Sequence, residues 1–324
     1  MKAIAQDRYG SPDVLELREV DTPAVGDHEV RVRVHAASVN ARDWHFVRGD
    51  PYLARLGLGV RGPKTRIRGT DFAGRVEAVG KAVTRFRPGD EVFGEADGAF
   101  AEYVCAADDV VEPKPAALSF EQAAALPLAG NTALMGLRDL GQVRPGRTVL
   151  INGASGGVGT FAVQIAKAFG AEVTGVCSTR NTELVRSLGA DHLVDYTRED
   201  FTRSGRRYDV VFDLVGNHSL TGFRRALEPA GRLVLSGGGV FEGGSVIGPM
   251  SLLIRGQVVS RFARHRLYVL TATPSRENLS ALRELADSGE LTPVIDRTYS
   301  LDEVPDAVRY LEVEHARSKV VITV

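Results

Sequence analysis

A glycine-rich run is the segment of this sequence whose residue types and spacing are best suited to chemistry. It reads Ile151-Asn152-Gly153-Ala154-Ser155-Gly156-Gly157-Val158-Gly159, and it follows an apolar strand pattern and opens a helical one, as a dinucleotide-binding loop does. Ala154 stands where the tight turn lies, Gly156 lets the backbone approach a pyrophosphate, and Gly159 lets helix and strand pack closely. First-turn amides and the helix dipole would hold the negative charge. The run therefore predicts a dinucleotide site, with a structural turn as the alternative, and contacts from Ala154, Ser155, Gly156, Gly157, Val158 and Gly159.

The end of the next strand indicates which nucleotide this loop binds. In NAD sites an Asp or Glu usually stands at the end of this strand, roughly 20 residues after the glycine loop, and binds the ribose 2′-hydroxyl. Here the strand ends Val176-Cys177-Ser178-Thr179-Arg180-Asn181, without an acid. Ser178 and Arg180 can donate to a 2′-phosphate, and Arg180 adds charge and fork geometry. We therefore expect NADPH, with Ser178, Arg180 and Asn181 at its adenosine end. In the alternative, Ser178 caps the next helix and Arg180 is solvated.

Strands and helices alternate around this loop. Thr148–Asn152 reads as a buried strand, and the apolar spacing from Val158 to Phe169 is helical, with Gly170 ending the helix. Further strands are expected at residues 172–177, 192–196, 209–214 and 232–235. This βαβαβ order predicts a parallel sheet covered on both faces. Tyr196 ends the third strand, where it either stacks near the adenine or is an edge aromatic.

The two ends of the chain have a different pattern. Residues 30–36 and 75–79 alternate with period two, and frequent glycine and proline turns suggest a barrel-like domain over residues 1–125. Residues 123–140 read as largely helical, with Pro127 and Gly130 as an interruption. Helices at 278–288 and 304–311 and a strand at 319–324 follow, so the tail is expected to return to the β-rich part.

Composition limits the class of protein. The 324 residues suggest about two domains, and the net charge of -1 provides no strong field toward nucleic acid or an anionic membrane. Two cysteines are too few for a disulfide framework or a four-cysteine metal site. The sequence has no span of 18 uncharged apolar residues and no signal-peptide core at its start. A cytoplasmic location is therefore expected.

Several stretches together resemble the medium-chain dehydrogenase/reductase superfamily, within its zinc-free quinone oxidoreductase branch. Besides the glycine loop, they are residues 32–44, 69–76, 86–94, 123–133 and 319–322, in the expected order along nearly the whole chain. The resemblance implies an α/β fold with a GroES-like β-barrel catalytic domain from residues 1–122 and 271–324. It also implies a Rossmann domain, a doubly wound parallel sheet, over residues 123–270. The stretch from Phe241 to Arg266 matches least clearly.

The resemblance also bears on metal. Zinc-dependent relatives carry a Cys near Asn40–Asp43 and a His-Glu pair after the glycine that corresponds to Gly69, where this sequence has Thr70 and Asp71. We therefore expect no metal; a substitute set would be His35 and His45 with Asp43 or Asp71. Zinc acidifies a bound alcohol and polarises a carbonyl. Without it, hydride must pass to an acceptor that is already electrophilic, such as a quinone or an α,β-unsaturated carbonyl.

Site residues follow from the same resemblance. It places Asn40 beside the substrate, where it can donate to a substrate oxygen or act as a loop cap, and Thr132 at the nicotinamide end. Asp43 either acts there or anchors the loop. His45 or Tyr52 could deliver a proton, although water can protonate a quinone dianion. We also expect cofactor contacts from four residues elsewhere: Val215, Ser236, Gly237 and Lys319.

The sequence therefore predicts an NADPH-dependent, zinc-independent oxidoreductase that transfers hydride to a quinone or another activated carbonyl. One alternative is a 2-enoyl-thioester or alkenal double-bond reductase, with Tyr52 as proton donor. Another is a non-catalytic NADPH-sensing protein. The expected partner is a small electrophilic carbonyl compound, and a homodimer could pair through the sheet edge near Tyr268–Leu270.

Overall fold

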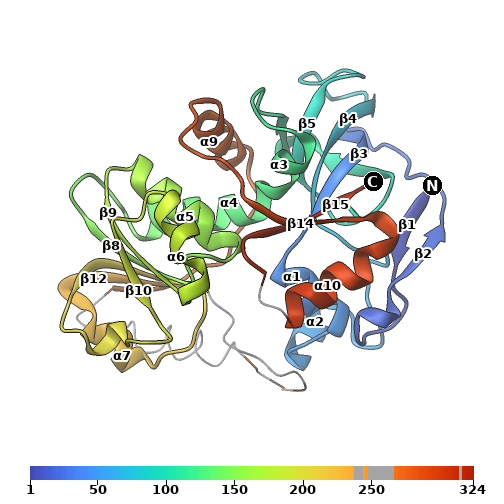
Figure 1. The fold of residues 1–324 in the computed structure, drawn as a ribbon. Helices are drawn as coiled ribbons and strands as arrows, with labels where there is room; N and C mark the ends of the chain where they lie inside the picture. The colour runs from blue at the N-terminus through green and yellow to red at the C-terminus, as the bar shows by residue number, and fades with distance from the viewer. Residues whose placement is uncertain (237–243, 245, 247, 249–265, 314–315) are drawn as a thin grey trace. The chain divides into compact units, whose positions relative to one another are not determined.

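The computed structural model, shown in Figure 1, describes residues 1–324 except 237–243, 245, 247, 249–265 and 314–315. Its contacts divide the chain into two compact units: unit 1 is Met1–Asn131 with Thr273–Val324, and unit 2 is Thr132–Ala272. Boundaries at 122/123 and 270/271 were expected from the sequence. The helix α3 (Phe120–Ala125) packs against four strands of unit 1, so the contacts keep this part of the chain in unit 1.

Unit 2 contains a six-stranded sheet in which every neighbouring pair is parallel. The strand order is β10-β9-β8-β11-β12-β13. The strands are β8 (Thr148–Asn152), β9 (Glu172–Cys177), β10 (His192–Asp195), β11 (Tyr208–Asp213), β12 (Leu227–Leu235) and β13 (Arg266–Val269). The parallel sheet expected from the alternating pattern is confirmed. β12 begins five positions before the expected residue 232, and β13 adds an edge strand.

Helices pack on this sheet because the apolar faces of the sheet and of the helices must be buried against each other. The helix α5 (Gly157–Ala168) contacts β8 and β9, α6 (Thr182–Ser187) contacts β9 and β10, and α7 (Leu220–Arg225) contacts β12. The described part of the unit also contains the π-helix η4 (Met135–Leu140) and the 3₁₀ turns η5 (Thr179–Asn181) and η6 (Phe201–Arg203). The core includes Leu150, Val176, Val211, Phe223 and Leu233.

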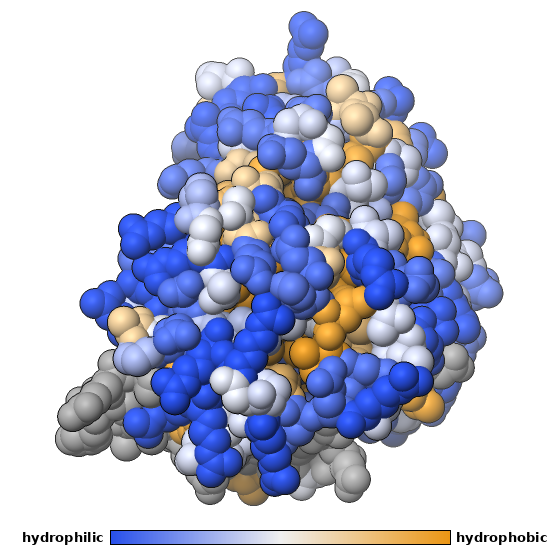
Figure 2. All heavy atoms as spheres, turned by 60° about the vertical axis from the view of Figure 1, so that its left-hand side comes forward, coloured by the Kyte–Doolittle hydropathy of each residue, from blue (hydrophilic) through white to orange (hydrophobic). Residues whose placement is uncertain are grey.

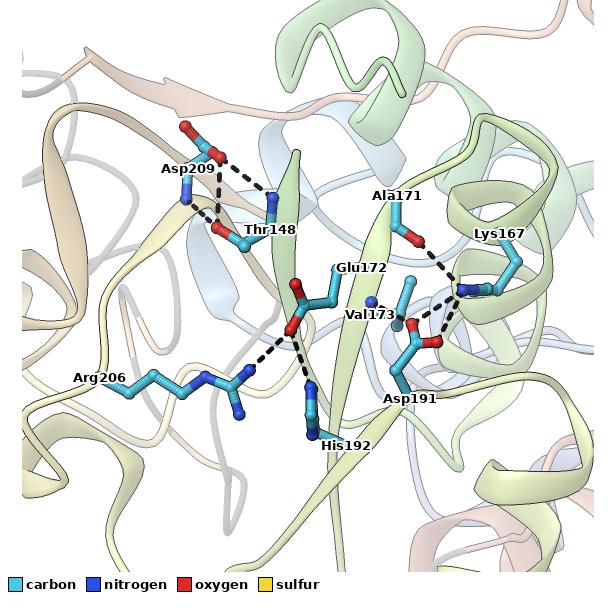
Figure 3. Close-up of polar contacts among 9 residues, drawn as sticks. All are labelled: Thr148, Lys167, Ala171, Glu172, Val173, Asp191, His192, Arg206 and Asp209. Atoms are coloured by element: carbon cyan, nitrogen blue, oxygen red, sulfur yellow. Dashed lines mark hydrogen bonds and ion pairs between the residues drawn. The ribbon is translucent and has the colours of Figure 1, made fainter. Parts of the chain in front are cut away.

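Hydrogen bonds and ion pairs link the amino ends of neighbouring parallel strands to each other, as Figure 3 shows. The Asp209 carboxylate accepts from the backbone N–H and hydroxyl of Thr148, at 3.0 and 3.2 Å. The Glu172 carboxylate contacts His192 Nε2 at 2.7 Å and accepts from Arg206 at 2.8 Å. In parallel α/β sheets ligands bind beyond the opposite, carboxyl ends. These contacts therefore belong to the structural end of the sheet.

Unit 1 is built on a seven-stranded sheet, with β14-β15-β3-β4-β5-β7 in order and β6 paired to β3. Its strands are β3 (Glu29–Val39), β4 (Asp71–Val79), β5 (Glu91–Glu95), β6 (Tyr103–Ala107), β7 (Val111–Pro113), β14 (Ile295–Ser300) and β15 (Lys319–Thr323). A separate pair joins β1 (Lys2–Ala5) to β2 (Glu16–Glu19). The C-terminal strand β15 lies beside β3, so the tail returns to the β-rich part as expected.

Short helices surround the sheet of unit 1. They are α1 (Ala41–Arg48), α2 (Arg55–Leu58), α3, α9 (Arg276–Asp287) and α10 (Val304–Val313), with 3₁₀ turns η1 (Pro12–Val14), η2 (Tyr52–Ala54), η3 (Asp108–Val110) and η7 (Leu301–Glu303). The helix α4 (Pro127–Leu134) carries the chain from unit 1 into unit 2. An interruption was expected at Pro127 and Gly130. The interruption at Pro127 is confirmed: α3 ends at Ala125 and α4 begins at Pro127, where the missing N–H of proline costs nothing. Gly130 does not interrupt the helix but lies inside α4.

Hydrophilic residues cover much of the face shown in Figure 2, and hydrophobic atoms gather in limited areas. Large apolar side chains that remain exposed include Leu56 and Val60. Among the described residues, no helix has the length and apolar character needed to cross a membrane.

Candidate functional site

The glycine loop joins β8 to α5 at the carboxyl end of the parallel sheet. Gly153 has φ of 90°, a conformation that favours glycine, and Gly156 is the N-cap residue of α5. A Cβ added to Gly159 would lie 2.1 Å from the Gly153 carbonyl oxygen, so packing within the protein requires this glycine. Among the described residues, a Cβ added to Gly156 would meet only that same oxygen, at 3.4 Å. The protein therefore leaves space beside Gly156, as a backbone approached by a pyrophosphate needs.

Neighbouring strand ends surround the loop. The Val215 side chain lies beside Gly153, since one of its methyl carbons would be 2.8 Å from a Cβ placed there. Ser236 follows β12 and donates its backbone N–H to the Asp213 carbonyl oxygen at 2.9 Å. The structure thus brings the expected residues Val215 and Ser236 to the same edge as the loop, whereas Gly237 lies outside the described residues.

Asp213 lies at this edge and was not predicted from the sequence. It ends β11, it is fully buried, and its Oδ1 accepts from Asn152 Nδ2 at 2.8 Å and from the backbone N–H groups of Val215 and Gly216. Its buried Oδ2 has no hydrogen-bond partner among the described residues. Burial raises the pKa of this carboxyl group. Asp213 therefore holds the turn after β11 against the end of β8.

The end of β9 carries the residues expected to choose the nucleotide. Ser178 occupies the N-cap position of η5, but its side chain makes no cap hydrogen bond, so capping does not account for its hydroxyl. Arg180 is exposed. Asn181 is buried and donates from Nδ2 to the Ser155 hydroxyl at 3.0 Å, while its Oδ1 has no partner among the described residues. This contact ties the residues after β9 to the glycine loop.

An acid that was not predicted from the sequence lies next to this group. Asp195 ends β10 and pairs in register with Cys177, the last residue of β9. Its carboxylate accepts hydrogen bonds from the Thr179 and Thr197 hydroxyls, which together with other contacts lower its pKa. Tyr196 follows directly and is 59% exposed. The alternation of strands located the end of β10, but only the register placed Asp195 beside β9.

A second group of expected residues lies in unit 1, around Asn40. The Lys319 ammonium donates to Asn40 Oδ1 at 2.6 Å and lies 3.7 Å from Asp71 Oδ2. Asn40 Nδ2 donates to Asp71 Oδ2 at 3.0 Å and points to the Ser38 carbonyl oxygen at 3.4 Å. Asn40, Asp71 and Lys319 are all buried. Because both ends of the Asn40 amide contact the protein, its contacts favour a positioning role over donation to a substrate.

Asp43 anchors the start of α1. Its Oδ2 accepts from the Asn40 backbone N–H at 2.7 Å, and the residue is 2% exposed. Burial, and the negative charge of Asp71, raise the pKa of Asp43 to about 7, although the Asn40 hydrogen bond acts in the opposite direction. The loop-anchoring interpretation of Asp43 accounts for these contacts.

Glu95 completes this buried group and was not predicted from the sequence. It ends β5, opposite Asp71 in the antiparallel register, and it is 3% exposed. Both of its carboxylate oxygens are buried without a hydrogen bond of good geometry among the described residues. Burial and the nearby Asp71 raise its pKa to about 8, against the opposing effect of Arg42 and other neighbours. Its position at a strand end gave no sequence signal, because only strand pairing brings it to Asp71.

The remaining expected residues lie apart from these hydrogen bonds. His45 Nδ1 contacts the Asp50 carbonyl oxygen at 2.8 Å, and burial lowers its pKa. Tyr52 is 45% exposed, with the Arg55 guanidinium 4.7 Å from its ring. Thr132 is buried within α4. No group of three or more His, Cys, Asp or Glu side chains that could hold a metal occurs within the described ranges.

Two protein families match parts of the sequence. The family described as zinc-binding dehydrogenase matches residues 188–322. The alcohol dehydrogenase GroES-like domain matches residues 26–116. The second match falls within the β-rich unit 1.

Similar proteins cover the whole chain. The 2-methylene-furan-3-one reductase of Solanum lycopersicum is 37% identical over 99% of this chain and 79% of its own length. The chloroplastic quinone-oxidoreductase QR1 of Triphysaria versicolor is 33% identical over 99% and 98%. The structure of the quinone oxidoreductase from Coxiella burnetii has a TM-score of 0.87 at 34% identity, over 100% of this chain and 99% of that one. The Escherichia coli quinone oxidoreductase complexed with NADPH has a TM-score of 0.83 at 26% identity, with both chains fully covered.

Proposed function

The chain belongs to the medium-chain dehydrogenase/reductase superfamily, in its quinone-oxidoreductase-like branch, and from this premise we propose that it is an NADPH-dependent, zinc-independent reductase of quinones or enones. That it is an NAD(P)H-dependent oxidoreductase follows from its relatives, which are named as reductases of quinones, alkenals and furanones. The preference for NADPH and the independence from zinc are the finer parts of the proposal.

The space beside Gly156 is the observation that carries the proposed cofactor site. The loop backbone can approach a pyrophosphate there, and the first turn of α5 supplies N–H groups that have no partner within the helix. Ser155 is held by Asn181 at the same edge. The residues present therefore fit a dinucleotide, which when bound supplies the hydride to the acceptor.

The preference for NADPH rests on the residues after β9. Ser178 has a hydroxyl that makes no cap hydrogen bond, and Arg180 is exposed at the same strand end, where a hydroxyl and a guanidinium suit a 2′-phosphate. Asp195 is the carboxylate closest in register, and the hydroxyls of two threonines bind it. A bound carboxylate is a weaker competitor for a ribose hydroxyl than a free one. This arrangement supports the phosphorylated cofactor.

In unit 1, we assign the acceptor to the surface that Asn40 and Asp43 support. In unit 2, we assign Thr132 to the nicotinamide end of the cofactor. Asn40 fixes the Lys319 ammonium beside Asp71, and Asp43 fixes the start of α1. In this proposal these residues orient the acceptor and exclude water from the site. None of them acts as a Lewis acid. An acceptor that is already electrophilic, a quinone or an enone, suits such a site because it needs no metal to polarise it.

The double-bond reductase alternative has one observation of its own. Tyr52 is exposed, so its phenol is free to reach a substrate carbon as a proton donor. Replacing Tyr52 with Phe separates the two activities: enone reduction would fall and quinone reduction would persist.

Steady-state oxidation of NADPH and NADH with an o-quinone, an alkenal and an enoyl thioester, measured side by side, tests the proposal. We expect turnover with the quinone or the alkenal and faster turnover with NADPH than with NADH. Turnover with the enoyl thioester alone would favour the double-bond reductase. Tight NADPH binding without turnover on any acceptor would favour the sensing protein.

Location and assembly are also part of the proposal. Cys105 and Cys177 are both free thiols, which suits a reducing compartment, and we assign the chain to the cytoplasm.

The edge strand β13 includes Tyr268, and we propose that this strand pairs with its copy across a homodimer. Sedimentation of the purified protein measures the assembly directly.

A further inference from the structure

A row of polar side chains crosses the sheet of unit 1 at one end. Ser38 of β3 pairs in register with Asp71 of β4, and Asp71 pairs with Glu95 of β5. Directly opposed residues in an antiparallel pair project from the same face. Two carboxyl groups are therefore neighbours on that face, and each residue is at most 3% exposed. Like charges placed opposite each other are destabilising, so this pair needs compensation.

The strong hydrogen bonds in the row go to Asp71 and not to Glu95. Asp71 accepts from the Ser38 hydroxyl at 3.0 Å, from Asn40 Nδ2 at 3.0 Å, and from the Leu128 backbone N–H at 3.2 Å. The Lys319 ammonium lies 3.7 Å away. Asp71 thus has three hydrogen-bond donors, whereas both oxygens of Glu95 lack a hydrogen bond of good geometry among the described residues.

Charged and polar side chains from four neighbouring elements face Glu95. Asp71 on β4 opposes its ionisation, while Arg42 on α1, the Asn131 amide on α4 and Lys319 on β15 favour it. Asn131 Nδ2 is itself committed to the Thr273 carbonyl oxygen at 2.9 Å. Lys319 also faces Asp71 and Asp43, so one buried ammonium serves three buried carboxyl groups.

Arg42 also faces this group and the buried Arg68 faces Asp43, but Glu95 has no ion pair of its own among the described residues. An unpaired buried carboxylate is so costly that it usually takes up a proton instead. Asp43 and Glu95 are the members whose pKa values are raised, to about 7 and about 8. At neutral pH, Glu95 is therefore the member that holds a proton most firmly.

We propose that Glu95 stores a proton inside unit 1 and supplies it to the reduced acceptor. The proposal rests on the proposed function, because a quinone or enone that receives a hydride must also gain a proton. The O–H bond of Glu95 breaks and an O–H bond forms on the oxyanion that hydride transfer leaves on the acceptor. Glu95 remains as a carboxylate and then recovers a proton from water.

Infrared spectroscopy of the resting protein at neutral pH tests the storage directly, without cofactor or acceptor. We expect C=O absorption of buried carboxylic acids that is weaker in Glu95→Gln by the contribution of Glu95 and restored in Glu95→Asp, while Asp43, whose pKa is raised to about 7, contributes to the spectrum of every variant. The matched control is Glu112→Gln, because Glu112 is equally buried but forms ion pairs with Arg85, Arg276 and Arg283. The control should retain the full absorption. A wild-type spectrum without this absorption, or an absorption of unchanged strength in Glu95→Gln, overturns the proposal.

Single-turnover measurements with a pH indicator in weak buffer test the delivery. In the wild type, proton uptake from solution should lag behind hydride transfer, since the acceptor first takes the stored proton. In Glu95→Gln the lag should vanish, while Glu112→Gln keeps it. Equal timing in all three proteins contradicts the delivery. If the wild type oxidises no NADPH with any acceptor, the proposed function fails, and the infrared result still decides whether Glu95 stores a proton.

Discussion

Replacing Glu95 with Gln should change how the stability of unit 1 depends on pH. Glutamine has nearly the shape of a protonated glutamate but cannot ionise. Glu95 is 3% exposed, opposite Asp71, and its pKa is raised from the usual 4.5 to about 8 in the folded protein. The wild type and the variant should therefore be similar in stability at low pH and diverge as the pH rises.

The sign follows from proton linkage. Between about pH 4.5 and about pH 8 the folded state retains a proton on Glu95 that the unfolded state releases, so the wild type loses stability as the pH rises. One proton corresponds to about 1.4 kcal/mol per pH unit. From about pH 5.5 to about pH 7.5, Glu95→Gln should therefore gain roughly 3 kcal/mol relative to the wild type. Asp43, with its pKa raised to about 7, contributes a similar slope in both proteins and cancels in the difference.

Urea denaturation followed by tryptophan fluorescence measures this difference. Trp44 is the one tryptophan of the chain, and it lies in α1 within unit 1, so the signal reports the unit that contains Glu95. Equal m-values in the two proteins would show that the same unit unfolds. Parallel plots of unfolding free energy against pH would refute the reasoning, because they would mean that Glu95 releases its proton equally in both states.

Three further predictions concern the cofactor site and the metal. The double substitution Ser178→Asp with Arg180→Ala should weaken NADPH roughly 10- to 150-fold and NADH much less, since charge-assisted hydrogen bonds contribute about 1.5–3 kcal/mol; an unchanged preference in fluorescence titrations would reject the assignment. Gly159→Ala should lower the free energy of unfolding by about 1–3 kcal/mol and weaken NADPH binding, because its Cβ would lie 2.1 Å from the Gly153 oxygen. The control Gly57→Ala should change neither, because a Cβ there meets nothing within 4 Å among the described residues. Chelator treatment should leave activity unchanged, and stoichiometric zinc in the purified active protein would contradict the metal-free proposal.

Local sequence patterns were sufficient for the fold and the family. The apolar run at residues 148–152, the helical spacing after Val158 and the glycines between them each depend on neighbours along the chain, and the structure confirms β8, α5 and the parallel sheet. The same local logic placed Ser178 and Arg180 at the end of β9. The nucleotide that they select stays a prediction, as do the roles of Asn40, Asp43 and Tyr52.

The buried charges depend on contacts that sequence spacing does not encode. Asn40, Asp71, Glu95 and Lys319 come from the start of α1 and from β4, β5 and β15, and strand pairing alone brings them together. Lys319 was expected to contact the cofactor, yet its hydrogen bonds in this structure go to Asn40 and the Val39 carbonyl oxygen. The sequence by itself determined which backbone segments form and which loop can hold phosphate, because these depend on local periodicity. Only the tertiary structure decided which carboxyl groups share one ammonium, because burial and register set the electrostatic energy of each group.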